Sequence, residues 1–106
     1  MSTFAIEPPT TIARQLGRRV QELRVREGWS QAELAHRSGV ALGTLRRFEQ
    51  AGAISLARLL KISAVLRHQD DFDRLFAAPP FRSIAEMQQA ERLKARAPKR
   101  GRTLTA

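Results

Sequence analysis

Residues 28–45 read GWSQAELAHRSGVALGTL, and this stretch decides the fold. Ser30 and Glu33 have the spacing of a capping box, in which hydroxyl and carboxylate each accept a backbone N–H at the start of a helix. Gly39 can adopt positive φ and turn the chain sharply. The stretch therefore predicts two short helices, one from Ser30 to just before Gly39 and one over residues 41–50.

Trp29 and Leu34 occupy the two positions of a hydrophobic staple across the start of the first of these helices. Two helices this short cannot bury much of each other. They are therefore either an ordinary corner of a larger helical bundle or a corner that presents one helix to a partner. The outward face of the second helix separates these alternatives.

Helical periodicity extends to both sides of this corner, and sustained strand alternation is absent. Apolar residues recur at helical spacing from Ile12 to Leu23, and glycines or prolines follow several of the predicted helices. The sequence predicts an all-α fold. Its helices are expected over residues 11–27, 30–38, 41–50, 55–66, 71–77 and 83–96.

The helical pattern and the position of the prolines predict that the chain has three parts. Residues 1–10 form an N-terminal extension, residues 11–77 form the helical domain, and residues 78–106 form an extension interrupted by Pro79 and Pro80. The end of this extension is basic and is expected to be disordered.

Charge points to a polyanionic partner. The 106 residues contain 19 Lys and Arg against 10 Asp and Glu, a net charge of +9, and no cysteine. Six of the bases and none of the acids lie in residues 92–106. Nucleic acid is the first candidate and an anionic membrane surface the second. No secretory signal or membrane span is evident, so we expect a cytoplasmic, nucleoid-associated protein without membrane partners.

The predicted helix over 41–50 has an unusual outward face. Leu45, Phe48 and Glu49 share one side, and the other side carries Leu42, Gly43, Arg46, Arg47 and Gln50. A glycine inside a helix costs about 1 kcal/mol relative to alanine. Adjacent arginines beside such a glycine favour a nucleic-acid face over a merely solvated one.

Residues 12–66 resemble the Cro/C1-type helix-turn-helix family, the XRE-like regulators. The resemblance is carried by the GWSQAELAHRSGV run, by Thr44-Leu45, and by Phe48-Glu49 before Gly52. It implies a compact five-helix, lambda-repressor-like domain that dimerises. It also implies that the third helix lies in the major groove of double-stranded operator DNA, with palindromic half-sites about 34 Å apart.

The resemblance assigns roles position by position. It places Arg46 and Arg47 where family members contact base edges. Leu42 and Gly43 fall where polar base-contacting residues are usual, so Leu42 offers apolar contact to a thymine methyl group and Gly43 offers close approach. Specificity then depends mainly on the two arginines.

Four further residues match the family pattern. Gln31 matches a residue that anchors to phosphate, and Thr44 either touches phosphate or packs. Arg24 and Glu49 match a partly buried salt bridge between the first and third helices, the alternative being two unrelated surface charges. Trp29, Ser30 and Glu33 are expected to be structural.

Two features outside the helical corner leave alternatives open. The run PKRGR at residues 98–102 resembles an AT-hook core, in which Arg100 and Arg102 would enter an A·T minor groove, but Thr103 replaces the usual proline. The alternative is a tail that adds affinity without sequence preference. The predicted fourth helix carries one apolar stripe for the core, formed by Leu56, Leu59, Ile62, Ser63 and Leu66. The surplus apolar residues off this stripe, such as Leu60 and Val65, suit either the core or a dimer seam.

Catalysis is not expected. His36 and His68 lack a neighbouring nucleophile or ligand cluster, and Asp70, Asp71 and Asp73 lack calcium-ligand spacing. We therefore predict no enzyme activity, no cofactor and no metal. The overall layout resembles HipB-like antitoxins, which repress their own operon and bind a HipA-type serine/threonine kinase toxin. A phage-type or stand-alone repressor, and a protein-interaction module, are the alternatives.

Overall fold

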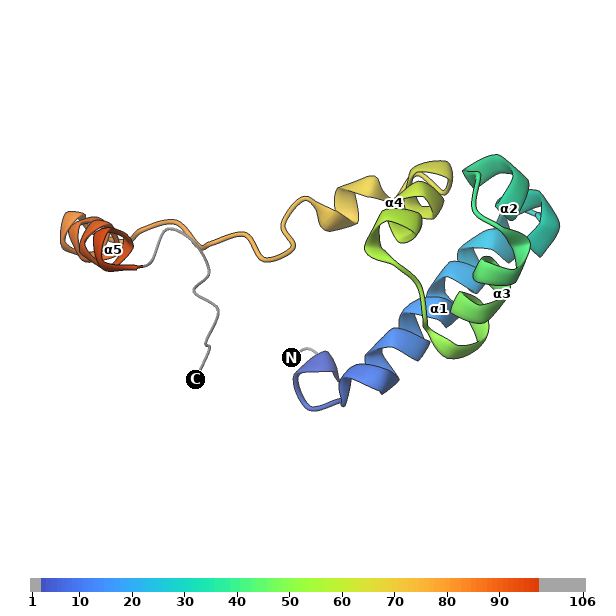
Figure 1. Ribbon diagram of the computed structural model, residues 1–106, viewed down its shortest axis with the longest axis horizontal. Coiled ribbons are helices and arrows are strands. Elements are labelled where there is room, and N and C mark those ends of the chain that lie inside the picture. Colours follow the sequence, from blue (N-terminus) through green and yellow to red (C-terminus); the bar gives the residue numbers. More distant parts are fainter. Residues whose placement is uncertain (1–2, 98–106) are drawn as a thin grey trace, which may run out of the picture. The chain divides into compact units, whose positions relative to one another are not determined.

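The computed structural model describes residues 3–97 (Figure 1). Those residues form five α-helices, two short 3-10 helices and no β-strand, which confirms the all-α prediction. The chain divides into two compact units between Leu75 and Phe76. The elements are η1 (Thr3–Ala5), α1 (Pro9–Arg26), α2 (Gln31–Ser38), α3 (Leu42–Ala51), α4 (Leu56–Val65), η2 (Gln69–Phe72) and α5 (Ile84–Arg96).

Helix α1 begins at Pro9, two residues before its predicted start at Thr11. Proline suits a first helical turn, because its fixed φ fits the helix and its missing N–H would have no partner there. The N–H groups of Thr11 and Ile12 both donate to the carbonyl of Pro8, which closes this turn. The other α-helices begin and end within one residue of their predicted bounds, apart from the predicted fifth helix.

The start of α2 is held differently from the predicted capping box. Ser30 Oγ accepts the N–H of Glu33 at 3.1 Å. The Glu33 carboxylate accepts from Arg37 Nε at 2.8 Å, one turn further along α2. The Trp29 indole packs against the core that contains Leu34, and the Arg37 guanidinium lies 4.4 Å from the Trp29 ring centroid. The chain therefore enters α2 through one hydroxyl cap, the staple and a cation–π contact.

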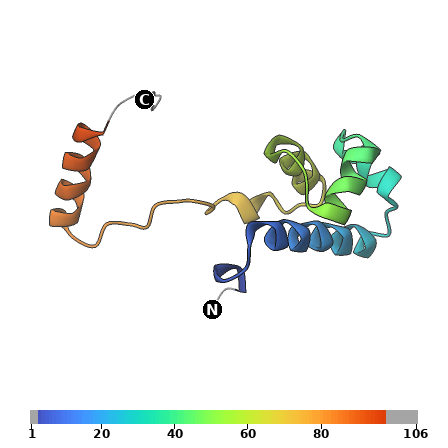
Figure 2. The same cartoon turned by 60° about the horizontal axis from the view of Figure 1, so that its bottom comes forward.

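The buried side chains of the first unit come mainly from α2, α3 and α4. Leu34, Leu45, Phe48 and Ile62 are fully buried. Helix α1 packs mainly against α3, and Figure 2 shows α1, in blue, running alongside the shorter helices. None of the apolar side chains of α1 is buried to the same degree as these four.

Two glycines allow α1 and α3 to approach closely. A Cβ atom on Gly17 of α1 would collide with the backbone carbonyl of Phe48, and one on Gly52 would collide with the backbone of Ala13. Gly52 also ends α3 with φ +79°, a left-handed conformation that disfavours a side chain. Gly17 was not among the residues predicted to be structural, although a glycine inside an apolar-periodic helix is a signal of close packing.

Replacing Gly52 with alanine should lower the free energy of unfolding by about 2–4 kcal/mol, because left-handed strain and the collision with α1 add together. Urea denaturation monitored by circular dichroism measures this. Gly43→Ala is the matched control: Gly43 lies within α3, has open space where its Cβ would point, and has no positive φ. That substitution should raise stability by up to about 1 kcal/mol. Equal losses for both variants would contradict the close-approach explanation.

The fifth helix predicted over residues 71–77 is wrong in place and type. The chain forms the 3-10 helix η2 at Gln69–Phe72, and Leu75 and Phe76 are exposed beyond it. Phe76 has φ +58°, which no right-handed helix accommodates. Arg67 also has positive φ, so the chain turns sharply between α4 and η2.

Helix α4 buries less of its predicted apolar face than expected. Ile62 and Ser63 are buried, and Val65, placed off the main stripe by the sequence analysis, packs against the core. Leu56, predicted on the core face, is 61% exposed, because it lies at the first position of the helix, away from the centre of the core. Leu60 is 41% exposed.

Candidate nucleic-acid interface

Helix α3 has one buried side and one exposed side, divided as the helical spacing predicts. Leu45, Phe48 and Glu49 are buried. Arg46 and Arg47 are exposed, as are Gly43 and Gln50. No ion pair in the described part of the chain engages either arginine. The two guanidinium groups are therefore available to an external anion or base edge.

Leu42 and Thr44, near the start of α3, are only partly exposed. Leu42 is half-buried and packs against the hydrophobic core, because the first position of α3 lies over the turn from α2. Its predicted place on the outward face is therefore wrong in part, and its capacity for apolar contact with a base is reduced. Thr44 is half-buried as well.

A polar groove of about 560 Å³ lies between the N-terminal ends of α3 and α4. Its lining includes Thr44, Arg47, Ser55 and Arg58. Ser55 Oγ accepts the backbone N–H of Arg58 at 3.2 Å and its Nη1 at 3.3 Å, so the guanidinium lies over the start of α4. Helix N-termini carry partial positive charge, and two arginines add to it. The groove suits a phosphate group, and Arg58 was not among the site residues predicted from the sequence.

A buried ion pair joins α1 to α3. Arg24 Nε donates to Glu49 Oε2 at 2.8 Å, and Arg24 Nη2 donates to Oε1 at 3.0 Å. The two side chains are 10% and 2% exposed. Arg24 Nη1 also donates to the Trp29 carbonyl at 2.8 Å, which ties in the start of α2. This bidentate geometry fixes α3 to α1 and leaves Arg46 and Arg47 exposed.

Gln31 belongs to the same network. Its Nε2 donates to Glu49 Oε1 at 3.0 Å, and the side chain is half-buried. Because an amide nitrogen has two hydrogens, one is used by Glu49 and one is left for a phosphate oxygen. Gln31 and Arg46 line one shallow polar groove of about 440 Å³. The network therefore places the predicted phosphate anchor beside a predicted base-contacting arginine.

The remaining predicted residues lie elsewhere. Arg100 and Arg102 lie outside the described residues. His68 Nδ1 lies 3.1 Å from Asp71 Oδ2, and no three His, Asp or Glu residues between positions 3 and 97 gather as metal ligands would. Within the same range no helix has the length and apolar character to cross a membrane.

Part of the chain matches a known family of proteins. Residues 20–67 match the family model described as Helix-turn-helix. The match runs from the middle of α1 to just beyond α4, so it contains the buried ion pair, the α2–α3 corner and both exposed arginines. No curated protein matches the chain. Residues 20–67 are therefore similar to a helix-turn-helix family, and this similarity supports the predicted resemblance to Cro/C1-type DNA-binding regulators over that part of the chain.

Proposed function

We propose that the chain is a homodimeric repressor that binds a palindromic operator in its own promoter, in the cytoplasm and on the nucleoid. The observation that carries the proposal is the pair of exposed arginines, Arg46 and Arg47, on a helix that a buried ion pair fixes to α1. Two copies related by a two-fold axis would place two such helices in successive major grooves about 34 Å apart.

The exposed residues of α3 would have different roles in DNA recognition. Arg46 and Arg47 would donate to guanine O6 and N7, the commonest specific contact in the major groove. Gly43 has open space beyond its Cα, so the α3 backbone can approach the bases there. Leu42, packed on the core, contributes less than the sequence analysis assigned to it.

Phosphate contacts would come from the flanks of α3. Gln31 has one free amide hydrogen, and Arg58 lies over the start of α4 in the groove that also contains Thr44. Contacts of this kind fix the orientation of a protein on the duplex without selecting a sequence. The interface would then combine a specific centre with two non-specific edges.

The direct test is selection of bound duplexes from a random DNA library, followed by titration of the purified protein against the enriched sequence and against DNA from its own upstream region. We expect an inverted repeat containing guanines in each half-site, and tighter binding than to scrambled DNA. An enriched sequence without two-fold symmetry, or no enrichment at all, would reject a homodimeric operator-binding repressor.

Removing residues 98–106 should lower affinity for every DNA sequence and reduce the salt dependence of binding. The deletion removes Lys99, Arg100 and Arg102, and the slope of log K against log salt falls by about 0.9 for each phosphate that is no longer neutralised. Titrations of DNA at roughly 50 to 200 mM salt give the change in this slope. The matched control removes only 103–106, which carry no charge. A change of specificity instead of slope would favour the AT-hook interpretation of the tail.

The finer proposal is that this repressor is the antitoxin of a HipBA-like pair and binds a serine/threonine kinase toxin. Support comes from the overall layout and from Phe76 and Phe81, which are 97% and 52% exposed just beyond the first unit. Uncovered aromatic side chains are typical of protein-binding surfaces. Purification from native cells and mass spectrometry test this: a co-purifying kinase supports the antitoxin, and DNA binding without a kinase supports a stand-alone or phage-type repressor.

A further inference from the structure

Helix α1 contributes to the polar groove beside the outward face of α3. Gln21 of α1 lines this groove together with Gln31, Arg46 and Gln50. All four residues belong to the first compact unit, so their arrangement follows from the packing of α1, α2 and α3. The proposed DNA contacts come from α2, α3 and α4, which leaves the part of α1 beside this groove without a function.

The contact between α1 and α3 decides which side of α1 lies beside the groove. Gly17 and Arg24 face α3, since a Cβ atom on Gly17 would collide with its backbone and Arg24 forms an ion pair with it. Val20 and Leu23 pack against the hydrophobic core on one flank of this line. At about 100° per residue, Gln21 falls on the other flank. That flank is therefore the side of α1 that adjoins the groove.

Two arginines continue the flank that carries Gln21. Arg18 and Arg14 precede Gln21 by three and seven residues, so the three side chains fall within about 60° around the helix axis. We call Arg14, Arg18 and Gln21 the α1 strip. Both arginines are exposed, and between residues 3 and 97 no ion pair engages either of them. The strip therefore adds two unpaired positive charges next to the groove.

The α1 strip suits the phosphate backbone of a nucleic acid. Its three residues span about 10 Å along the helix axis, because each residue rises about 1.5 Å. One strand of B-DNA carries one phosphate charge for about every 3.4 Å of its axis. Guanidinium and amide groups both donate to phosphate oxygens. The length and chemistry of the strip thus match about three successive phosphates of one strand.

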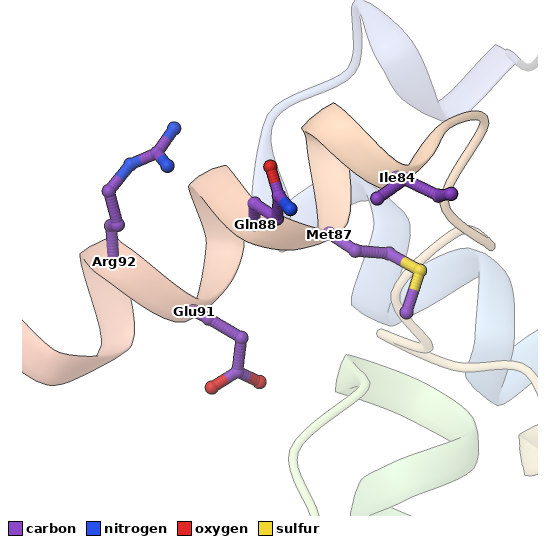
Figure 3. A pocket seen from close by; sticks show the side chains of 5 residues that line it. All are labelled: Ile84, Met87, Gln88, Glu91 and Arg92. Atoms are coloured by element: carbon purple, nitrogen blue, oxygen red, sulfur yellow. The ribbon is translucent and has the colours of Figure 1, made fainter.

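Helix α5 also carries basic residues, but its charge does not point to a polyanion as clearly. Figure 3 shows the acidic Glu91 and the basic Arg92 projecting from different sides of α5. Arg92 Nη2 also donates to Gln89 Oε1 at 2.8 Å, within the same helix. A polyanion contact for α5 would rest on charge alone, whereas the α1 strip also adjoins a groove beside α3.

From these observations we propose that the α1 strip is an additional phosphate-contacting edge of the DNA interface. Arg14, Arg18 and Gln21 donate to the backbone of one strand beside the groove, while α3 contacts the bases. This inference rests on the proposed function and deepens it, because it assigns the contribution of α1 to the interface. Phosphate contacts carry no direct sequence information, so the strip strengthens binding to every duplex.

The salt dependence of DNA binding tests the strip. Arg14→Ala and Arg18→Ala should each lower the slope of log K against log salt by about 0.9, because each variant leaves one more phosphate unneutralised. Between roughly 50 and 200 mM salt, each variant should therefore lose about 3.5-fold less affinity than the unaltered chain. The titrations use the full chain with the selected operator and with a scrambled duplex, and both slopes should change equally.

Arg26→Ala is the matched control, because Arg26 is an exposed arginine of the same helix about 140° around the axis from Gln21. It should leave the slope unchanged, and circular dichroism should show all three variants folded. Slopes that do not differ between the control and the strip variants would overturn the proposal. If Arg46→Ala still abolishes operator preference in that case, the proposed function stands and only the role of α1 is lost.

Hydroxyl-radical footprinting on the selected operator locates the contact. The double variant Arg14→Ala with Arg18→Ala should lose protection of about two successive sugars at one edge of each half-site, one for each phosphate contact removed. The remainder of the half-site should stay protected, and Arg26→Ala should keep the whole footprint. A footprint unchanged in the double variant, or protection lost evenly across the half-site, would overturn the proposal.

Discussion

Replacing Arg24 with alanine should lower the free energy of unfolding by about 3–5 kcal/mol, because the Glu49 carboxylate would remain buried without its partner. The Glu49 side chain is 2% exposed, so water cannot replace the two hydrogen bonds that Arg24 donates to it. Loss of the bond from Arg24 to the Trp29 carbonyl adds to the effect. Urea denaturation of the purified protein measures the change.

Two comparisons separate the ion pair from general effects of losing an arginine. Arg18→Ala removes an exposed arginine from the same helix and should change stability by no more than about 0.5 kcal/mol. The double variant Arg24→Met with Glu49→Leu removes both charges and should recover much of the loss, because no buried charge is left unpaired. If Arg18→Ala costs as much as Arg24→Ala, the ion pair is not the cause.

Replacing Arg46 or Arg47 with alanine should weaken binding to the selected operator by about 1–3 kcal/mol each, roughly 5- to 150-fold. Both side chains are exposed on α3 and make no ion pair within the described residues, so their removal should leave thermal unfolding nearly unchanged. Fluorescence anisotropy with operator and scrambled duplexes measures the two affinities. The loss should be larger for the operator, because base contacts carry the sequence preference.

Arg74→Ala is the matched control for these variants, since Arg74 is an exposed arginine beyond η2 and outside the α3 face. It should reduce affinity for both duplexes slightly and equally, through charge alone. Normal operator binding by both Arg46→Ala and Arg47→Ala would remove α3 as the recognition helix. The Arg24 variant should change stability, because Arg24 belongs to a buried ion pair. The Arg46 and Arg47 variants should change DNA binding, because both side chains are exposed.

Local signals in the sequence predicted most of the helices. A cap, a staple and a glycine depend on residues within one turn of each other, and Ser30, Trp29 and Gly39 acted as expected. The division of α3 into buried and exposed sides followed from its period. Resemblance to a family supplied the pairing of Arg24 with Glu49 across 25 residues, which spacing in the sequence could not establish.

The wrong predictions arise where another interaction, the position in the core or the backbone geometry competes with the local signal. Glu33 has the capping-box spacing, yet its carboxylate binds Arg37. Leu56 has the apolar character of a core residue but lies at the edge of the core. A helix was predicted over residues 71–77, but positive φ at Phe76 prevents a helix from reaching residue 77.

The amino-acid order alone was sufficient for helix content, for the sharp corner between two short helices, and for the resemblance to a helix-turn-helix family, since these depend on periodicity and on neighbours along the chain. Three-dimensional packing was needed for the rest. The close approach of α1 and α3 at Gly17, the bond from Gln31 to Glu49, the position of Arg58 and the groove shared by Gln21 and Arg46 all join segments far apart in the chain. Such contacts depend on how the helices fill space around one core, and periodicity does not encode that.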